Sequence, residues 1–422
     1  TFAGGDVVEL LRAYAENPAA FTDDTGIPES GNGVPDVLDE TKWELDWLSR
    51  MQRPDGSVLS VASHAGASPP SSDASPCRYG PASTASTLAA AAAFAEGSSV
   101  LASVGAVGRV YPGFASGLAG RAQAAWKWAV ANPAVAFSNT AVKLAGGEQD
   151  LAGNERAAKR LQAAVFLFGL TGGAEYRSAI DAEHPLLQAA FDPFHLEAIE
   201  TALEYARLPG ATPTVAREID EHFKASVEGP RYFGALATPA SDPYLAYLQA
   251  YVWGSNQSKA DQGNMFADVV TFGIDPSAGA APTDYAARYV HYLHGVNPLG
   301  LAYLTNMSGS GAERSVTRMF HSWFAHGSQW DFVGGTSAGP PPGFLTGGPN
   351  PGYAWDRCCP SSCGVFNDSA CGAAPPAPPS GQPPQKSYKD FNEGWPLDSW
   401  SVTEPDLAYQ ARYVRLLSKF VR

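Results

Sequence analysis

Apolar residues recur at helical spacing along most of the chain. The stretch 36–52 reads DVLDETKWELDWLSRMQ, and its apolar positions, Trp43 and Trp47 among them, predict one broad face of an amphipathic helix. Pro35 before it and Pro54-Asp55-Gly56 after it are start and stop signals. Similar patterns predict helices at Asp6–Glu16, Ala82–Glu96, Gly117–Asn132, Asn154–Gly169, His195–Ala206, Val215–Val227, Tyr244–Ser255, Ala260–Phe272, Thr283–His294 and Pro405–Phe420.

These helices predict an all-α fold. No stretch alternates in the manner of a strand with hairpin signals, so we expect few and short strands. No heptad pattern persists, and the loops differ in length, which favours a barrel of helical hairpins over a coiled coil. We expect a single domain over residues 1–422.

The stretch 297–403 has a different character. It is rich in Gly, Pro, Ser and aromatic residues and has little periodicity, so we interpret it as a functional loop region. Within it, residues 357–387 are rich in Cys and Pro, and we expect them to form an excursion on the surface of the domain.

Composition narrows the possible partners. The chain has 422 residues, of which 45% are hydrophobic and 17% charged, so it can bury a sizeable core. The net charge of −14 argues against a nucleic-acid partner, which needs clustered Lys and Arg. No uninterrupted apolar run is long enough to span a membrane, and Ala89–Ala93 is interpreted as part of a close-packed helix. Ten Trp residues supply flat apolar faces on which pyranose rings can stack, although we expect most of them in the core.

Four of the five cysteines cluster in one short stretch, namely Cys358, Cys359, Cys363 and Cys371. Their spacing lacks the paired CxxC of a zinc finger, so we favour two disulfides of undetermined connectivity over a zinc site. Disulfides indicate an oxidising setting and therefore a secreted protein. Cys77 is left over, and we expect it to be a free buried thiol.

Three separated segments carry a family resemblance. Residues 27–56 read IPESGNGVPDVLDETKWELDWLSRMQRPDG, and Tyr292–Pro298 read YLHGVNP. The third segment runs from Gly347-Gly348-Pro349 to Trp400-Ser401-Val402-Thr403-Glu404 and leads into a helix. Together, and in this order, they resemble glycoside hydrolase family 9, the resemblance extending over essentially the whole chain.

This resemblance implies an (α/α)6 barrel with an open cleft, in which β-1,4-glucosidic bonds of cellulose or a related β-glucan are hydrolysed with inversion. Inversion needs a carboxylic acid that protonates the leaving oxygen and a carboxylate that activates water. No cofactor is required for this chemistry. Relatives often hold a structural Ca²⁺ in oxygen-rich loops, such as the region of Asp150 and Glu155. We expect a monomer.

Glu404 matches the family's catalytic acid. We expect it at the N-terminal edge of the last helix, with Pro405 in the first turn and with Trp400 among the apolar neighbours that raise its pKa. The helix N-terminus would lower that pKa, and a mere capping role is the plain alternative. Glu393, in Asn392-Glu393, mimics the family's Asn-Glu pair, but no helix follows it directly.

The catalytic base is not evident. The family carries it on Asp-Ala-Gly-Asp, whereas Thr1–Asp6 resembles the residues just after that motif. Asp6 is better interpreted as a helix-start residue. We therefore expect residues 1–422 alone to have little hydrolytic activity, either because a longer protein supplies the base or because the chain is a degenerate relative.

Sugar contacts are predicted in the loop region. The family often has His-His-Arg where this chain has Phe320-His321-Ser322-Trp323, so His321 matches one His, and Arg318 or Arg314 would replace the Arg. The candidate stacking platforms are Trp323, Trp330, Tyr353 and Trp355, with Trp253 at the end of a predicted inner helix.

Other functions are weighed against this one. A β-glucan-binding remnant without turnover would keep the same barrel and aromatic groove. A polysaccharide lyase would need a basic site, which the net charge of −14 disfavours. No G-x-S-x-G or phosphate-binding glycine motif occurs. Asp36 and Asp39 are interpreted as ordinary complements of a helix dipole.

Overall fold

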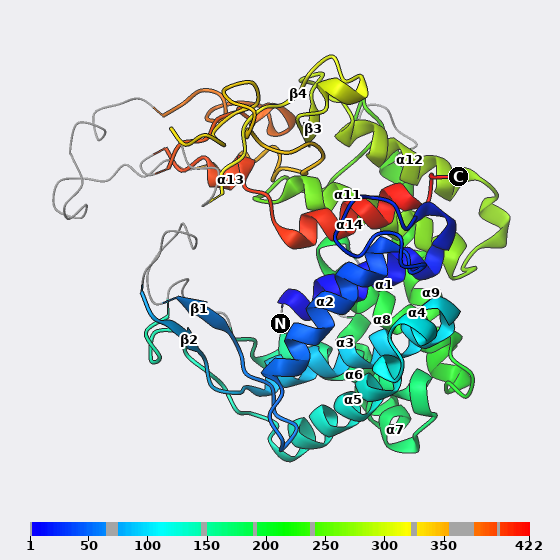
Figure 1. Cartoon of the computed structure of the whole chain (residues 1–422). Coiled ribbons are helices and arrows are strands. Elements are labelled where there is room, and N and C mark those ends of the chain that lie inside the picture. Colours follow the sequence, from blue (N-terminus) through cyan, green and yellow to red (C-terminus); the bar gives the residue numbers. More distant parts are fainter. Residues whose placement is uncertain are drawn as a thin grey trace.

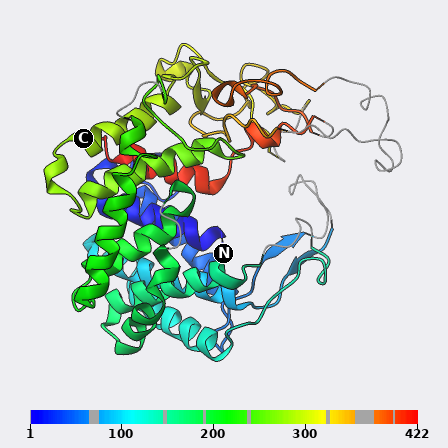
Figure 2. The same cartoon turned by 180° about the vertical axis from the view of Figure 1, so that it is seen from behind.

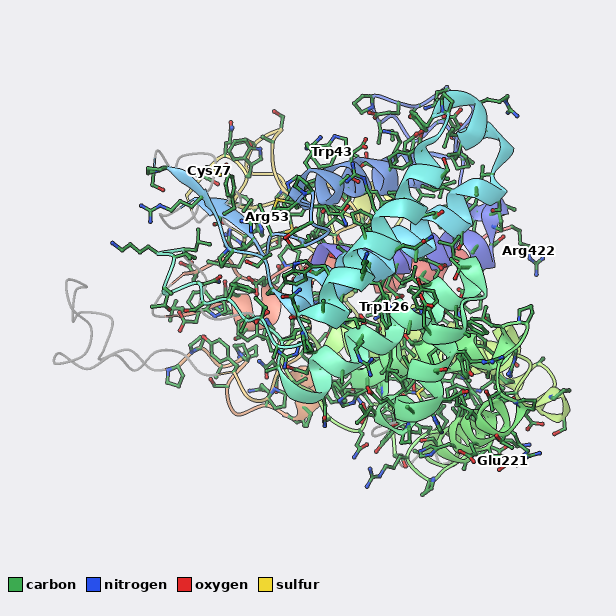
Figure 3. The ribbon with its side chains drawn as sticks, turned by 90° about the horizontal axis from the view of Figure 1, so that it is seen from below. Trp43, Arg53, Cys77, Trp126, Glu221 and Arg422 are labelled. Atoms are coloured by element: carbon green, nitrogen blue, oxygen red, sulfur yellow. The ribbon has the colours of Figure 1, made fainter. Side chains whose placement is uncertain are left out.

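The computed structural model describes residues 2–64, 75–144, 150–188, 192–236, 241–321, 327–353, 375–394 and 397–422. Trp323, Trp355 and the four clustered cysteines lie outside these ranges, so the predictions on them stay predictions. Cys77 is described; it is exposed on a short strand rather than buried, as Figure 3 also shows.

Six helices form a closed ring around one core (Figures 1 and 2). Each contacts the next, and the last returns to the first; they are α1 (Phe2–Glu16), α3 (Thr84–Ser103), α6 (Gly153–Thr171), α8 (Leu196–Arg207), α11 (Ser255–Thr271) and α14 (Leu407–Ser418). In the described ranges, further helices pack against the ring from outside, namely α2 (Asp36–Met51), α5 (Phe114–Ala131), α7 (Ala174–Glu183), α9 (Pro213–Val227) and α12 (Ala281–Leu293). The predicted all-α barrel is confirmed.

The remaining elements are short. The strands β1 (Ala62–His64) and β2 (Cys77–Tyr79) pair antiparallel, while β3 (Ala302–Thr305) and β4 (Ser315–Val316) pair parallel. The short helices are α4 (Gly105–Val110), α10 (Phe233–Leu236) and α13 (Trp400–Thr403). In the described part of the stretch between β3 and α13, most of the backbone is irregular, as the composition predicts.

Small residues let helix α3 pack closely against its neighbours in the ring and against the outer helices α2 and α5. Its alanines from Ala89 to Ala93 are buried, and a Cβ on Gly97 would lie 2.9 Å from the Leu45 side chain of α2. By length and composition α3 could cross a membrane, but 83% of its apolar window is buried inside the protein. It is therefore accounted for as a core helix.

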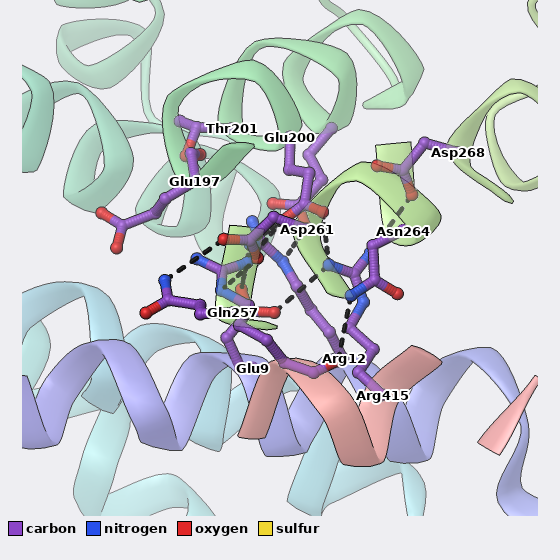
Figure 4. A network of polar contacts seen from close by, with 12 residues as sticks. Glu9, Arg12, Glu197, Glu200, Thr201, Gln257, Asp261, Asn264, Asp268 and Arg415 are labelled. Atoms are coloured by element: carbon purple, nitrogen blue, oxygen red, sulfur yellow. Dashed lines mark hydrogen bonds and ion pairs between the residues drawn. The ribbon is translucent and has the colours of Figure 1, made fainter. Parts of the chain in front are cut away.

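A buried cluster of charges joins four helices of the ring (Figure 4). The guanidinium of Arg415, on α14, is fully buried and pairs with Asp268 of α11 at 3.2 Å and with Glu200 of α8. Arg12 of α1 also reaches Glu200, at 2.7 Å, and Arg412 of α14 reaches Glu9 of α1 at 2.7 Å. The helices must keep the positions in which these charges are paired, because an unpaired buried charge is costly.

Two local predictions are wrong. Residues 244–254 of the helix predicted at 244–255 are not helical, because the Asp242 carboxylate accepts hydrogen bonds from the backbone N–H groups of Tyr244 and Ala246 and so caps an irregular turn. Helix α11 accordingly begins at Ser255 instead of Ala260. Trp43 is not on the buried face of α2 but is 62% exposed on its outer side (Figure 3).

The charge cluster predicts a large stability effect at Arg415. We expect Arg415→Ala to lower the free energy of unfolding by about 3–5 kcal/mol, since it leaves buried carboxylates without their partner. Denaturant unfolding followed by circular dichroism measures this loss. Exposed Arg109, in α4, is a control for which Arg109→Ala should cost at most about 0.5 kcal/mol. A loss below about 1 kcal/mol at Arg415 would show that the cluster does not hold the ring together.

Candidate active site

A glycine-rich loop brings three distant segments together at one end of the ring. The backbone N–H of Gly348 donates to the Val402 carbonyl at 2.8 Å, and that of Asn256, at the start of α11, donates to the Gly347 carbonyl at 3.0 Å. Asn350 adds a bond from its side-chain amide to the Ser401 carbonyl at 3.0 Å. Gly348 has φ +94°, and a Cβ there would lie 2.4 Å from the Asn256 side chain, so only glycine fits. The loop 347–350 thus fixes α11 beside residues 401–404.

Glu404 lies in the extended link between α13 and α14. Its φ and ψ are −64° and 128°, because a residue before proline is driven out of the helical region. The N-cap of α14 is Asp406, whose carboxylate accepts from the Ala408 N–H at 2.8 Å. Glu404 thus lies at the N-terminal edge of the last helix, as predicted, whereas Pro405 precedes the N-cap and is not in the first turn.

The pKa of Glu404 is raised to about 7. Burial of the carboxyl is the largest cause, the negative charge of Asp406 adds to it, and a hydrogen bond from the Trp253 side chain opposes it. A carboxyl whose pKa lies this far above 4.5 can hold a proton near neutral pH, which suits a general acid. The predicted rise in pKa is confirmed, but its electrostatic part comes from Asp406, which the sequence analysis missed.

Trp253 precedes α11 in a turn that presents its ring to the site. The ring is 49% exposed and hydrogen-bonds Glu404. Gly254, with φ +79°, follows it, and a Cβ on this residue would lie 2.8 Å from the Tyr409 hydroxyl of α14. Trp253 was predicted as a stacking platform at the end of an inner helix; it stands instead on the turn before α11, and its stacking role stays a prediction.

The segment of His321 runs beside that of Glu404. The N–H of Phe320 donates to the Thr403 carbonyl at 3.3 Å, and the Phe320 ring meets Trp400 edge-on with centroids 5.2 Å apart. Burial lowers the pKa of His321, so its imidazole is neutral at pH 7. The structure therefore brings together the backbones of the predicted acid and the predicted sugar-binding histidine.

Arg318 is engaged within the loop region. Its guanidinium pairs with Asp331 at 2.9 Å and lies 4.7 Å above the Phe332 ring. The Asp390 carboxylate accepts from the Arg318 backbone N–H at 2.9 Å and so fixes the segment. The other candidate, Arg314, donates to the Leu299 carbonyl at 2.7 Å. A sugar contact by either arginine stays a prediction.

The described stacking candidates differ in exposure. Trp330 is 40% exposed and available to a ligand. Tyr353 is only 8% exposed, its hydroxyl donates to the Leu397 carbonyl, and its ring packs edge-on against Phe391. In contrast to the prediction, Tyr353 offers little surface for a sugar, because the loop region has its own small aromatic core.

Two other acidic residues clarify the site. Asp6 lies in the second turn of α1, because the helix begins at Phe2, and its pKa is raised to about 7 by burial and by the charge of Asp406. Asp406 thus acts on the carboxyls of both Asp6 and Glu404. Glu393 is held by its backbone, which exchanges two hydrogen bonds of 2.9 Å with Ser399, and it stands in no helix.

A carboxylate cluster on another face could hold a cation. Asp23, Asp36 and Asp39 each offer an oxygen within 4.8 Å of the others. The cluster flanks the PESGNG loop (residues 28–33), and Asp23 accepts the N–H groups of Gly31 and Gly33 of this loop at 2.7 and 2.6 Å. The Oδ1 atom of Asp36 is buried with no hydrogen-bond partner in the described ranges, which fits a hard cation as its ligand.

The cluster bears on two sequence interpretations. Asp36 and Asp39 lie in the first turn of α2, as predicted for complements of its dipole, and their carboxylates also accept hydrogen bonds from Ser30 and Asn32 of the preceding loop. Glu155 is exposed in the first turn of α6, and Asp150 accepts from the Phe137 N–H at 3.2 Å. In the described ranges, the region of Asp150 and Glu155 gathers no such set of carboxylates.

Comparison with known proteins agrees with this geometry. The family model described as "Glycosyl hydrolase family 9" matches residues 3–417. Endoglucanase C of Cellulomonas fimi is 29% identical over 86% of this chain and 33% of its own length. A xyloglucan-specific endo-beta-1,4-glucanase of Bacteroides ovatus is 29% identical over 93% of this chain and 61% of its own length.

A crystal structure of a protein from the same family is also similar to this chain. A metagenome-derived endoglucanase of the same family superposes with a TM-score of 0.76 at 25% identity, over 100% of this chain and 68% of that one. The chain spans from about a third to three fifths of the length of the two curated relatives described here.

The charge of Asp406 gives a prediction on the acid. We expect Asp406→Asn to lower the pKa of Glu404 from about 7 toward its ordinary value of 4.5, without reaching it because burial remains. Asn keeps the N-cap, so α14 should stay intact. Carbon-detected NMR titration of the Glu404 carboxyl measures the shift.

The matched control is Asp275→Asn, another capping aspartate, which accepts from the Ser277 N–H at a distant 3₁₀ turn. It should leave the pKa of Glu404 unchanged. An unaltered Glu404 titration in Asp406→Asn would contradict the assigned role of Asp406.

Proposed function

This chain belongs to glycosyl hydrolase family 9, and we propose that it binds β-1,4-glucan and, in the protein that carries it, hydrolyses the glucosidic bond with inversion. Glu404 acts as the general acid. The observation that carries the proposal is its carboxyl with a pKa of about 7, hydrogen-bonded to an exposed tryptophan and set beside the His321 segment. The printed names of the relatives, endoglucanase and xyloglucan-specific glucanase, support this substrate class.

The residues have distinct roles in this reaction. Trp253 stacks on a pyranose face and orients the acid through its N–H, while the neutral imidazole of His321 hydrogen-bonds sugar hydroxyls. Glu404 gives its proton to the glycosidic oxygen as the bond to the anomeric carbon breaks. A carboxylate on the opposite face takes a proton from the attacking water. We assign this base to none of the residues that the structure describes.

A substitution at the acid tests the proposal in the longest natural form of the protein. We expect Glu404→Gln to lower the release of reducing sugar from soluble β-glucan at least 100-fold, because Gln has no proton to give. Retention on cellulose should be unchanged. In the unsubstituted protein, activity should fall as the pH rises through about 7, since only protonated Glu404 is competent.

Glu393→Gln is the matched control, since it removes the carboxyl of the Asn392-Glu393 pair, and it should keep most of the activity. Hydrolysis that persists in Glu404→Gln would refute the assignment of the acid. Cellulose retention without any hydrolysis by the unsubstituted protein would instead favour a binding protein of the same fold.

We also propose that Asp23, Asp36 and Asp39 hold a structural Ca²⁺. A bound cation would tie the PESGNG loop to the start of α2 and to Tyr111, whose hydroxyl donates to Asp39 at 2.6 Å. The unpartnered Oδ1 of Asp36 is the observation that supports it. Such a cation would contribute stability and take no part in the chemistry.

Removal of calcium tests this second proposal. We expect EDTA to lower the melting temperature by several degrees and re-added Ca²⁺ to restore it, because the cation binds only the folded state. Asp36→Asn should abolish the response to calcium. A melting temperature that is the same with EDTA and with Ca²⁺ would show that these carboxylates hold no cation.

A further inference from the structure

A cavity outside the acid site lies on the loop that leads to Trp253. Its volume is about 710 Å³, within the range of small-ligand sites, and its wall is formed by three tyrosines, Tyr244, Tyr247 and Tyr251. Gln385 and Lys386 complete the wall together with several prolines. We call this cavity the tyrosine pocket. The mechanism proposed above does not use it.

The wall of the tyrosine pocket is a rigid turn. Asp242 is 2% exposed and accepts hydrogen bonds from Tyr244 N–H at 2.9 Å, Ala246 N–H at 3.2 Å and the Gln385 side-chain amide at 3.2 Å. Between them Leu245 adopts φ +54°, a conformation that non-glycine residues rarely occupy. Such strain persists only where the surroundings over-determine it, and it is concentrated at functional sites.

A buried lysine anchors the same turn from beneath. Lys259 of α11 is fully buried, donates to the Ala246 carbonyl and lies 4.0 Å from the Asp242 carboxylate. Its ammonium group also lies 3.9 Å from the ring centre of Tyr292 and 4.9 Å from that of Tyr251. The pocket is therefore preformed, so a ligand need not order its wall.

The chemistry of the wall fits a neutral sugar ring. Aromatic and proline faces suit the C–H face of a pyranose, and the wall also carries Gln249, whose side chain is exposed. Its amide can accept a hydrogen bond from one sugar hydroxyl and donate one to another. Of the two charged wall residues, Asp242 faces the buried Lys259 and Lys386 has the opposite sign, so no cluster of like charge forms and the wall suits a neutral polyol better than an ion.

The position of the pocket links it to Glu404. Tyr251 stands two residues before Trp253, which hydrogen-bonds the acid. Pro351, another wall residue, directly follows the loop 347–350 that packs against residues 401–404. Both sides of the pocket are thus continuous with segments that build the acid site.

We propose that the tyrosine pocket binds a further glucosyl unit of the glucan chain whose scissile bond lies at Glu404. This inference rests on the proposed function, because it takes the same polymer as the ligand. It assigns chain-length preference to Tyr247 and Gln249: a long oligosaccharide reaches the pocket, whereas cellobiose bound beside Glu404 does not.

The test compares oligosaccharides of two lengths by calorimetry in the Glu404→Gln background, which prevents turnover. We expect Tyr247→Ala to raise the Kd of cellohexaose about tenfold and to change that of cellobiose less than twofold. Tyr79→Ala, on exposed strand β2 away from the pocket, is the matched control and should alter neither. A cellohexaose Kd within twofold of the parent in Tyr247→Ala would overturn the proposal.

Two further measurements distinguish a direct sugar contact in the pocket from a folding defect and from an indirect effect through Trp253. Gln249→Leu keeps the aromatic wall and the bond between Gln385 and Asp242 but removes an exposed amide, so it should also weaken cellohexaose, even if Tyr247→Ala fails to fold. In Tyr247→Ala with Glu404 retained, the pKa of Glu404 should stay at about 7; a shift would mean that the effect passes through Trp253 and would overturn a direct contact.

The outcomes also separate this inference from the proposed function. If Tyr247→Ala weakens cellohexaose binding but the unsubstituted protein hydrolyses no glucan, the proposed function is refuted and the role of the pocket stands. If the unsubstituted protein hydrolyses glucan but Tyr247→Ala leaves cellohexaose binding unchanged, only the role of the pocket is refuted.

Discussion

The buried charge cluster is the constraint on which the ring depends. Arg415 is fully buried and meets carboxylates from α1, α8 and α11, while Arg412, one turn earlier on α14, reaches Glu9 of α1 at 2.7 Å and Asp261 of α11 at 3.3 Å. Any shift of α14 relative to its neighbours would leave buried charges without their partners in a medium of low dielectric constant, which is costly. The cluster therefore fixes the last helix relative to the first, although some 400 residues of sequence separate Glu16 and Arg415.

The position of α14 then determines the acid. Its N-cap, Asp406, places a negative charge near Glu404, and its first turns carry Tyr409, against which the Trp253–Gly254 turn packs. The glycine loop holds the other side. A carboxyl between these groups is partly removed from water yet still faces an exposed indole, which accounts for a pKa of about 7. Fold stability and acid strength thus share one physical cause, the placement of α14.

Much of this could be predicted from sequence, and the exceptions have physical reasons. The helical spacing of apolar residues over 36–51 predicts α2, because the core contacts of this helix follow helical geometry. Glu404 is identified through segments that resemble the family. The turn at 244–254 was misassigned because one side chain, Asp242, outcompetes helical hydrogen bonding. The charge cluster escaped prediction because Glu9, Arg12 and Arg415 are residues normally assigned to solvent, and only the folded ring shows that they pair.

The central claim is that a glucosidic oxygen meets Glu404 beside Trp253. A crystal structure of the Glu404→Gln protein with bound cellohexaose tests it most directly. The account predicts a sugar ring stacked on Trp253 and a glycosidic oxygen within about 3.2 Å of the residue 404 side chain. An oligosaccharide bound with no ring on Trp253 and no glycosidic oxygen near residue 404 would contradict it.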